Sequence, residues 1–353
     1  TAAGLSMAAL GQLVDLSANQ IKKYEHDIDM PKSSNLLKLS KELGVRTEYF
    51  FRSNELKLEH VEYRKRASMS KKDLLRVNDD ILEQVERWHA LLSFYPDSIR
   101  PISQFSVPAD LPRNIGSLEQ IDELVDSLRA AWGFGTGIIP DLTDALEKKG
   151  IMVISTNADK KSLFDGLQCS VGDFSVIAIN AHFPGDRQRL TIAHELGHLV
   201  LEGRLVGDLA LDKKGLEKAC TYFAGAFLLP KNEIISHLGS TRSGIEGREL
   251  YLLKHEFGIS MAAVLYRAKQ AGIISEHYLK TGMIEFAKKG WKKLEPGDSY
   301  KAEKTYLFDH LLYRALGQDL ISEAKAAELA KKSVSDFHME RMLWITDAKV
   351  INK

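Results

Sequence analysis

Apolar residues recur at helical spacing along most of the chain and form short continuous runs in only one region. Helical patterns cover residues 7–14, 17–25, 36–43, 77–92, 117–132, 140–149, 190–201, 216–229 and 249–271. The apolar run 151–154 and the segments 167–171 and 174–179 predict strands, and Gly172-Asp173 between the last two predicts a hairpin. Two or three further amphipathic helices are expected within residues 275–353. The pattern predicts a mainly α protein that contains a small α+β domain with an antiparallel sheet.

The most informative helix carries the segment Thr191-Ile-Ala-His194-Glu195-Leu-Gly-His198-Leu-Val-Leu201. Because an α-helix repeats every 3.6 residues, His194 and His198 share one face and can bind one metal ion. Glu195 lies one position further round, where it can contact a water on that metal and act as general base. The flanking residues are apolar, so the helix is expected to be buried, and buried polar side chains need partners. The pattern predicts one zinc ion per chain; the alternative is a pair of core histidines satisfied by hydrogen bonds.

A third protein ligand must come from another part of the chain. Glu202 lies two turns beyond His194, so it converges poorly on the same ion. Glu217 opens the helix over 216–229, which can return and face the metal helix, and it is the expected ligand. Alternatives are Asp208 and Asp212 in the intervening loop, and Cys220, which is otherwise a small buried residue.

The first sixty residues carry a different pattern, in which two short amphipathic helices flank the turn Asp15-Leu16-Ser17. The hydroxyl of Ser17 can cap the second helix, and Asp29-Met-Pro31 then interrupts the helical pattern. Two short helices on a tight turn, the second polar on its outer face, predict a helix-turn-helix. Residues 1–60 contain equal numbers of basic and acidic side chains, so a module that binds protein rather than DNA remains open.

The segment between these two regions is basic at first and proline-rich later. Residues 61–76 contain six basic side chains against Glu62 and Asp73, so they can follow a DNA backbone or form a solvated linker. A helix over 77–92 is followed by Pro96, Pro101, Pro108 and Pro112, which are typical of an extended linker. The expected domains are 1–60, with a truncated start; 61–116, a basic segment, helix and linker; 117–235; and a helical C-terminal region, 236–353.

The amino-acid composition says more about the cellular compartment of the protein than about its chemistry. The 353 residues contain 48 basic and 48 acidic side chains, so net charge names no partner. Two cysteines favour a reducing, cytoplasmic compartment over a disulfide framework. No apolar run is long enough to span a membrane, and no membrane partner is expected.

Two resemblances follow from these motifs. Gly4-Leu5-Ser6, the turn, Ile21-x-x-Tyr24-Glu25, Met30-Pro31 and Leu43-Gly44-Val45 resemble the Cro/CI (XRE-type) helix-turn-helix. This resemblance implies that Ser17, Asn19 and Gln20 contact base edges of double-stranded operator DNA and that Lys22 and Lys23 lie near phosphates. Operators of such domains are read by dimers, so a homodimer is expected.

The second resemblance is to the ImmA/IrrE metallopeptidases. It rests on His194-Glu-Leu-Gly-His198, on Phe164-Asp165-Gly166, and on the helix from Glu217 to Pro230. It implies a zincin-like peptidase domain in which His194, His198 and Glu217 bind zinc and Glu195 is the general base. Many members have a Glu-Ala-Asn run where this chain has Ala219-Cys220-Thr221, which leaves Glu217 as the carboxylate on that helix start.

Together these features predict a cytoplasmic regulator that joins DNA binding to a zinc-dependent endopeptidase. The resemblance implies a repressor or antitoxin as the substrate, and an exposed strand edge beside the metal helix could hold it by main-chain hydrogen bonds. The alternatives are a regulator with a structural or sensory zinc site and no turnover, and an antitoxin-like protein that binds other proteins.

Overall fold

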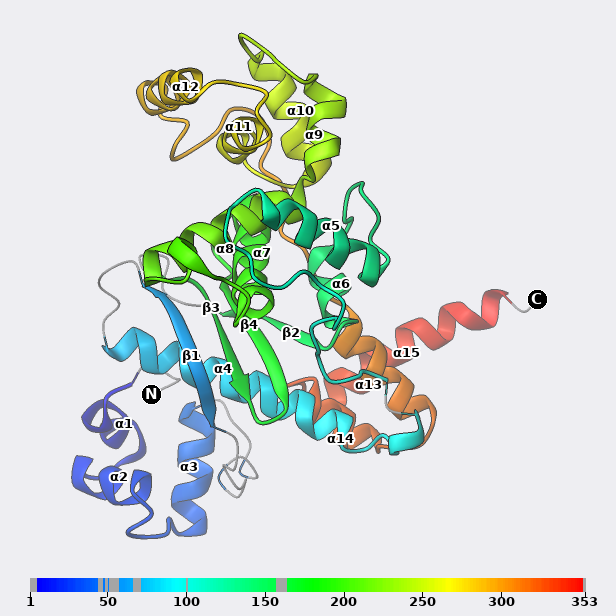
Figure 1. Ribbon diagram of the computed structural model, residues 1–353. Helices are drawn as coiled ribbons and strands as arrows, with labels where there is room; N and C mark the ends of the chain where they lie inside the picture. The colour runs from blue at the N-terminus through cyan, green and yellow to red at the C-terminus, as the bar shows by residue number, and fades with distance from the viewer. Residues whose placement is uncertain are drawn as a thin grey trace.

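Four strands form one sheet at the centre of the molecule, in the order β1-β3-β4-β2 (Figure 1). They are β1 (Leu58–Lys65), β2 (Ile151–Thr156), β3 (Phe164–Val171) and β4 (Phe174–Asn180). This computed structural model describes residues 5–43, 47, 50, 57–65, 71–99, 101–156 and 164–351. It confirms a mainly helical protein with a small sheet.

The sheet is mixed, so the prediction of an antiparallel sheet is wrong for one strand. β3 and β4 form the predicted antiparallel hairpin, and Gly172 in its turn has a φ of 55°. β2, however, pairs with β4 in parallel, from Ile151 opposite Ser175 to Thr156 opposite Asn180. The apolar run of β2 is buried on both faces, as parallel strands require, but an apolar run does not encode strand direction.

Strand β1 was not predicted from the sequence. It pairs antiparallel with β3, with Tyr63 opposite Leu167 and Lys65 opposite Phe164. Residues 61–65 are therefore part of the sheet and not a solvated linker. The structure does not describe Arg66 or the side chains of Arg64, Lys65, Lys71 and Lys72. The expected role of these residues toward DNA therefore stays a prediction.

One face of the sheet packs against the helices around the histidine motif. These are α5 (Gln120–Trp132), α6 (Leu142–Glu147), α7 (Gly185–Leu201) and α8 (Lys213–Leu228). Their hydrophobic cluster includes Val153, Ile177 and Ile179 from the strands and continues into α9 (Lys231–Leu238), α10 (Gly247–Phe257), α11 (Met261–Gln270) and α12 (Glu276–Lys288). The cluster runs from Leu111 to Phe286, across the expected boundary at residue 235.

The opposite face is covered by α4 (Lys71–Leu92) together with helices from the C-terminal end of the chain (Figure 1). Those helices are α13 (Leu307–Gly317), α14 (Glu323–Leu329) and α15 (Val334–Ile351). With α12 they make four described helices after residue 275, where two or three were predicted. Met152, Ile154 and Val176 contribute the strand side of this second hydrophobic cluster.

The first helices have a small core of their own. α1 (Met7–Val14), α2 (Ala18–Glu25) and α3 (Ser33–Leu43) enclose Leu10, Val14, Ile21 and Leu39. The hydroxyl of Ser17 accepts from the amide of Gln20, which is the predicted cap of α2. The resemblance residues Gly4, Gly44 and Val45 lie outside the described residues. Across the described parts of the chain, no helix is long and apolar enough to cross a membrane.

Candidate metal centre

Two packed helices place the histidine motif. α7 is almost wholly buried, and it crosses α8 where Gly197 meets Cys220. A Cβ atom at Gly197 would lie 3.2 Å from the Cα of Cys220 and from Cδ1 of Phe223, so the missing side chain allows the two helices to approach closely. This contact brings the start of α8 toward the middle of α7.

The expected ligands converge at that point. Nε2 of His194 lies 3.2 Å from Nε2 of His198 and 3.3 Å from Oε2 of Glu217. Oε1 of Glu217 lies 3.8 Å from Nε2 of His198. Among the described residues, these three form a group whose donor atoms all lie within 4.8 Å of one another, and the group excludes Cys220, Asp208 and Asp212.

The donor set fits a tetrahedral zinc ion. Zinc binds imidazole nitrogen and carboxylate oxygen at about 2.0–2.2 Å, so two ligands of a tetrahedral site lie about 3.3 Å apart. The separations of 3.2 Å and 3.3 Å from Nε2 of His194 match that spacing. Both histidines are almost wholly buried, whereas the Glu217 side chain is one-third exposed, so the group opens to solvent on the side of α8.

Glu195 follows His194 on α7, and its side chain lies close to strand β3. Its side chain is buried, with 1 % of its surface exposed. Across from it is Gly166, where a Cβ atom would come within 3.7 Å of Cγ of Glu195 and 2.5 Å of Cγ2 of Thr191. Glycine at this position lets the strand pass directly beside the glutamate. β3 therefore passes directly beside Glu195 on the metal helix.

Sequence reasoning missed Thr221. Its hydroxyl oxygen lies 3.4 Å from Nδ1 of His194, on the side of the ring away from the metal group. A hydrogen bond there fixes the ring orientation and directs Nε2 toward a metal. The available signal was spacing, because Thr221 follows Glu217 by one helical turn and shares its face.

Other candidates near the site have structural roles. Asp212 caps α8, with its carboxylate accepting from the amide of Gly215 at 2.8 Å. The hydroxyl of Tyr222 donates to Asp122, which also accepts from Arg267, so Tyr222 packs in the core.

The expected DNA-contacting residues lie together on α2 and its cap. Ser17, Asn19, Lys22 and Lys23 are exposed, and Gln20 is half-buried. Nε2 of Gln20 donates to Asp29 at 2.7 Å, which orients its amide group.

Comparisons with known proteins match two separate regions of the chain. Residues 146–269 match the family Peptidase M78, described as an IrrE N-terminal-like domain, and residues 1–50 match a helix-turn-helix family. The chain thus carries a helix-turn-helix at its N-terminal end and an IrrE-like domain of the M78 peptidases.

Two curated relatives match the second region, both named "Radiation response metalloprotease IrrE". The protein of Deinococcus deserti is 37% identical over 99 residues, covering 26% of this chain and 34% of the relative. The protein of Deinococcus radiodurans is 34% identical over 102 residues, covering 27% and 30%. The chain therefore spans about a third of the length of these relatives. A solved structure titled "Mycobacterium tuberculosis transcriptional regulator" is similar with a TM-score of 0.30 at 18% identity, over 51% of each chain.

Proposed function

We propose that this chain, which joins a helix-turn-helix to an IrrE-like M78 peptidase domain, is a DNA-binding regulator with zinc-dependent endopeptidase activity. The observation that carries this proposal is the convergence of His194, His198 and Glu217, with Glu195 beside them. We assign DNA binding to residues 1–60 and peptide cleavage to the domain expected over 117–235. The proposed substrate is a regulatory protein of the repressor or antitoxin kind.

The proposed chemistry is peptide hydrolysis with Glu195 as the general base. When bound by the three ligands, zinc polarises a carbonyl and makes water acidic enough to react near neutral pH. Glu195 takes a proton from the attacking water and later donates it to the leaving amine, so the C–N bond breaks and an acid and an amine are formed. Thr221 holds the ring of His194, and Gly166 leaves room for the Glu195 carboxylate.

The same geometry supports a mode of substrate binding. An extended peptide would pair with β3, the strand beside Glu195, by main-chain hydrogen bonds. The expected exposed edge is covered in this structure, because β3 lies between β4 and β1. We propose that β1 occupies the position of the substrate and that a substrate strand replaces it.

The first experiment measures zinc per chain in the wild type and in Glu217→Ala. One equivalent in the wild type, and at least a tenfold weaker affinity in the variant, is the expected result. Asp212→Ala is the matched control, since it removes a nearby carboxylate that caps a helix and should leave the affinity unchanged. Equal affinity in Glu217→Ala would reject the three-ligand site.

The second experiment measures catalysis. The zinc-loaded protein is incubated with a peptide library made from bacterial cytosol, and new peptide ends are identified by mass spectrometry. Glu195→Gln should retain zinc and lose cleavage by about 10²–10⁴-fold, as expected for loss of a general base. Full cleavage in this variant would exclude the mechanism, and no cleavage by the zinc-loaded wild type would favour a regulator with a structural zinc site.

The third experiment tests DNA binding with the promoter DNA next to the gene. Gel shifts over a salt series should show affinity that falls steeply with salt. Lys22→Ala and Lys23→Ala should each reduce the salt slope by about one, whereas Lys280→Ala on α12 should not. A DNA affinity that does not change with salt concentration would favour a protein-binding module.

A further inference from the structure

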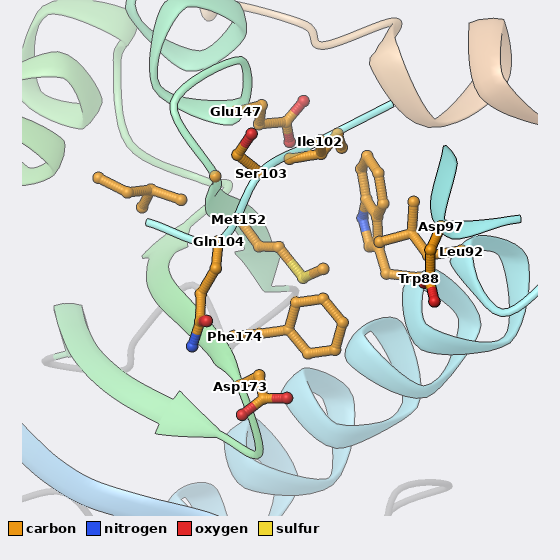
Figure 2. Close-up of a pocket in the computed structure, with 12 residues that line it drawn as sticks. Trp88, Leu92, Asp97, Ile102, Ser103, Gln104, Glu147, Met152, Asp173 and Phe174 are labelled. Carbon is orange, nitrogen blue, oxygen red and sulfur yellow. The ribbon is translucent and has the colours of Figure 1, made fainter. Parts of the chain in front are cut away.

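A cavity separate from the metal group lies beside β2, an edge strand of the sheet, between α4 and the end of α6. It has a volume of about 270 Å³ and is bounded by α4, by the segment around residue 103, by the start of β2 and by the β3–β4 turn (Figure 2). Its aromatic and thioether walls are Trp88, Phe174 and Met152, whose side chains face one another. Neither the histidine motif nor the DNA-binding helices contribute to it.

One buried carboxylate lines this cavity. Glu147, at the end of α6, has only 3 % of its surface exposed. One of its oxygens accepts from the hydroxyl of Thr305, and the amide of Val153 also donates to the group. Its Oε1 is buried and accepts no hydrogen bond from any described residue. A buried oxygen without a donor costs free energy, so the position favours a ligand that donates to it.

Among the described residues that line the cavity, the charged side chains are all acidic. Asp97 and Asp173 lie on its wall beside Glu147, and its described lining contains no lysine, arginine or histidine. The carboxylates of Asp97 and Asp173 disfavour an anion and favour a cation, and a cation can also contact the faces of Trp88 and Phe174. The volume is slightly below that of drug-sized sites, so the ligand must be small.

We propose that this cavity is an effector site for a compact organic ammonium ion with an apolar body, whose N–H groups donate to Oε1 of Glu147. The apolar body would lie between Trp88, Phe174 and Met152. β1 follows the N-terminal helices in the chain, and α4 follows β1 and also packs on β2, so an occupant of this cavity touches a helix that is next to β1 in the chain order. The site is independent of the proposed peptidase activity, and its test uses neither zinc nor a substrate.

Binding of such a cation must be linked to a proton. Burial, with a smaller contribution from the nearby carboxylates Asp144 and Asp141, raises the pKa of Glu147 to about 8, although the hydrogen bonds from Thr305 and Val153 oppose this shift. The carboxyl is therefore mostly neutral at pH 7, and an ammonium ion must displace its proton. Affinity should rise by about tenfold per pH unit up to that pKa. From α4, the titratable side chain of His89 lies edge-on to Phe174, which lines the cavity.

The experiment titrates the full-length protein with 2-phenylethylamine by calorimetry between pH 6 and pH 8. Its matched probes are 2-phenylethanol and phenylacetate, which replace the ammonium by a neutral and an anionic group. The expected result is saturable binding of the amine that strengthens with pH and releases a proton, with no binding of phenylacetate. Repeating the titration with His89→Gln should leave the pH dependence unchanged.

Glu147→Gln should weaken binding of the amine at least tenfold and abolish the proton release, while Glu119→Gln, an exposed glutamate outside the cavity, should change neither. Retained urea stability of Glu147→Gln shows that lost binding is not unfolding. Four results would each overturn the proposal. They are equal affinity for the amine and the alcohol, binding of the amine that weakens with rising pH, full affinity for the amine in Glu147→Gln, and no binding of the amine at millimolar concentration.

Discussion

At the scale of single residues, Glu147 connects stability with pH. Burial raises its pKa from the ordinary 4.5 to about 8, so the folded state binds a proton that the unfolded state has released between these values. The stabilising contribution of the neutral form is complete below pH 4.5 and is lost as the pH rises toward 8. The free energy of unfolding should therefore fall with pH in this window.

Glu147→Gln tests this directly, because glutamine stays neutral and can still accept from Thr305. The variant should remove a slope of at most about 1.4 kcal/mol per pH unit, and it should be more stable than the wild type at pH 8. Urea unfolding at pH 5.5, 6.5 and 7.5 measures the slopes. Glu119→Gln serves as the control, and parallel curves for wild type and Glu147→Gln would contradict the assignment.

At the scale of elements, the metal group depends on how closely α7 and α8 approach. Gly197→Ala gains about 1 kcal/mol of helix propensity but places a methyl group 3.2 Å from Cα of Cys220, and overpacking of this kind costs about 1–3 kcal/mol. We expect α8 to shift and zinc affinity to fall. Gly225→Ala on α8 is the control, since its new methyl would meet only side chains at 3.5 Å or more. Zinc titration of both variants checks the prediction, and equal affinities would refute it.

The pairing of β1 with β3 gives a second prediction at this scale. Alternate residues of an antiparallel strand donate to the neighbouring strand, so one of Glu62→Pro and Tyr63→Pro must remove a ladder hydrogen bond. That variant should loosen β1, and it should cleave the peptide library faster if β1 occupies the substrate position.

Hydrogen exchange gives a readout that needs no catalysis. The amides of β3 around Leu167 and Gln168 should exchange faster in the proline variant, while those of β4 stay protected. Faster exchange without faster cleavage would leave β1 as an ordinary strand of the sheet and remove it from the substrate position.

Sequence patterns identified the local elements better than their pairing. Caps and apolar spacing predicted α2, α7 and α8, and the Gly172-Asp173 turn predicted the β3–β4 hairpin. They did not predict β1, because its charged sequence lacks the alternation of a half-buried strand. They also did not predict that β2 runs parallel to β4. Pairing depends on contacts between distant residues, which a local pattern does not encode.

In the candidate site too, local spacing predicted some residues, and the packing of distant elements determined the others. Helical spacing alone placed His194, Glu195 and His198 together, whereas Glu217 had to be chosen among Cys220, Asp208 and Asp212. The crossing of α7 and α8 at Gly197 places Glu217 in the group. The cavity around Glu147 could not have been predicted, since its walls come from segments that are far apart in the sequence.

At the scale of the whole molecule, α4 and the C-terminal helices share one core on one face of the sheet. Val77 and Ile81 of α4, Met152 of β2, and Leu312 of α13 belong to a single buried cluster, in which Leu312 is 1 % exposed. Residues near 80 and near 310 are thus joined through the strands of the peptidase domain (Figure 1). The C-terminal helices should therefore stabilise the sheet against which α7, the helix of His194 and His198, packs.

Leu312→Ala tests this coupling. Removing a buried leucine costs about 2–5 kcal/mol, and because the cluster includes strand residues, the loss should appear in the unfolding of the peptidase domain. Leu343→Ala on α15, where the side chain is 69% exposed, is the matched control and should change stability by less than about 0.5 kcal/mol. Urea unfolding is followed by tryptophan fluorescence and by zinc release. If Leu312→Ala unfolds in a separate early step while zinc release keeps its wild-type midpoint, the C-terminal helices do not stabilise the metal site.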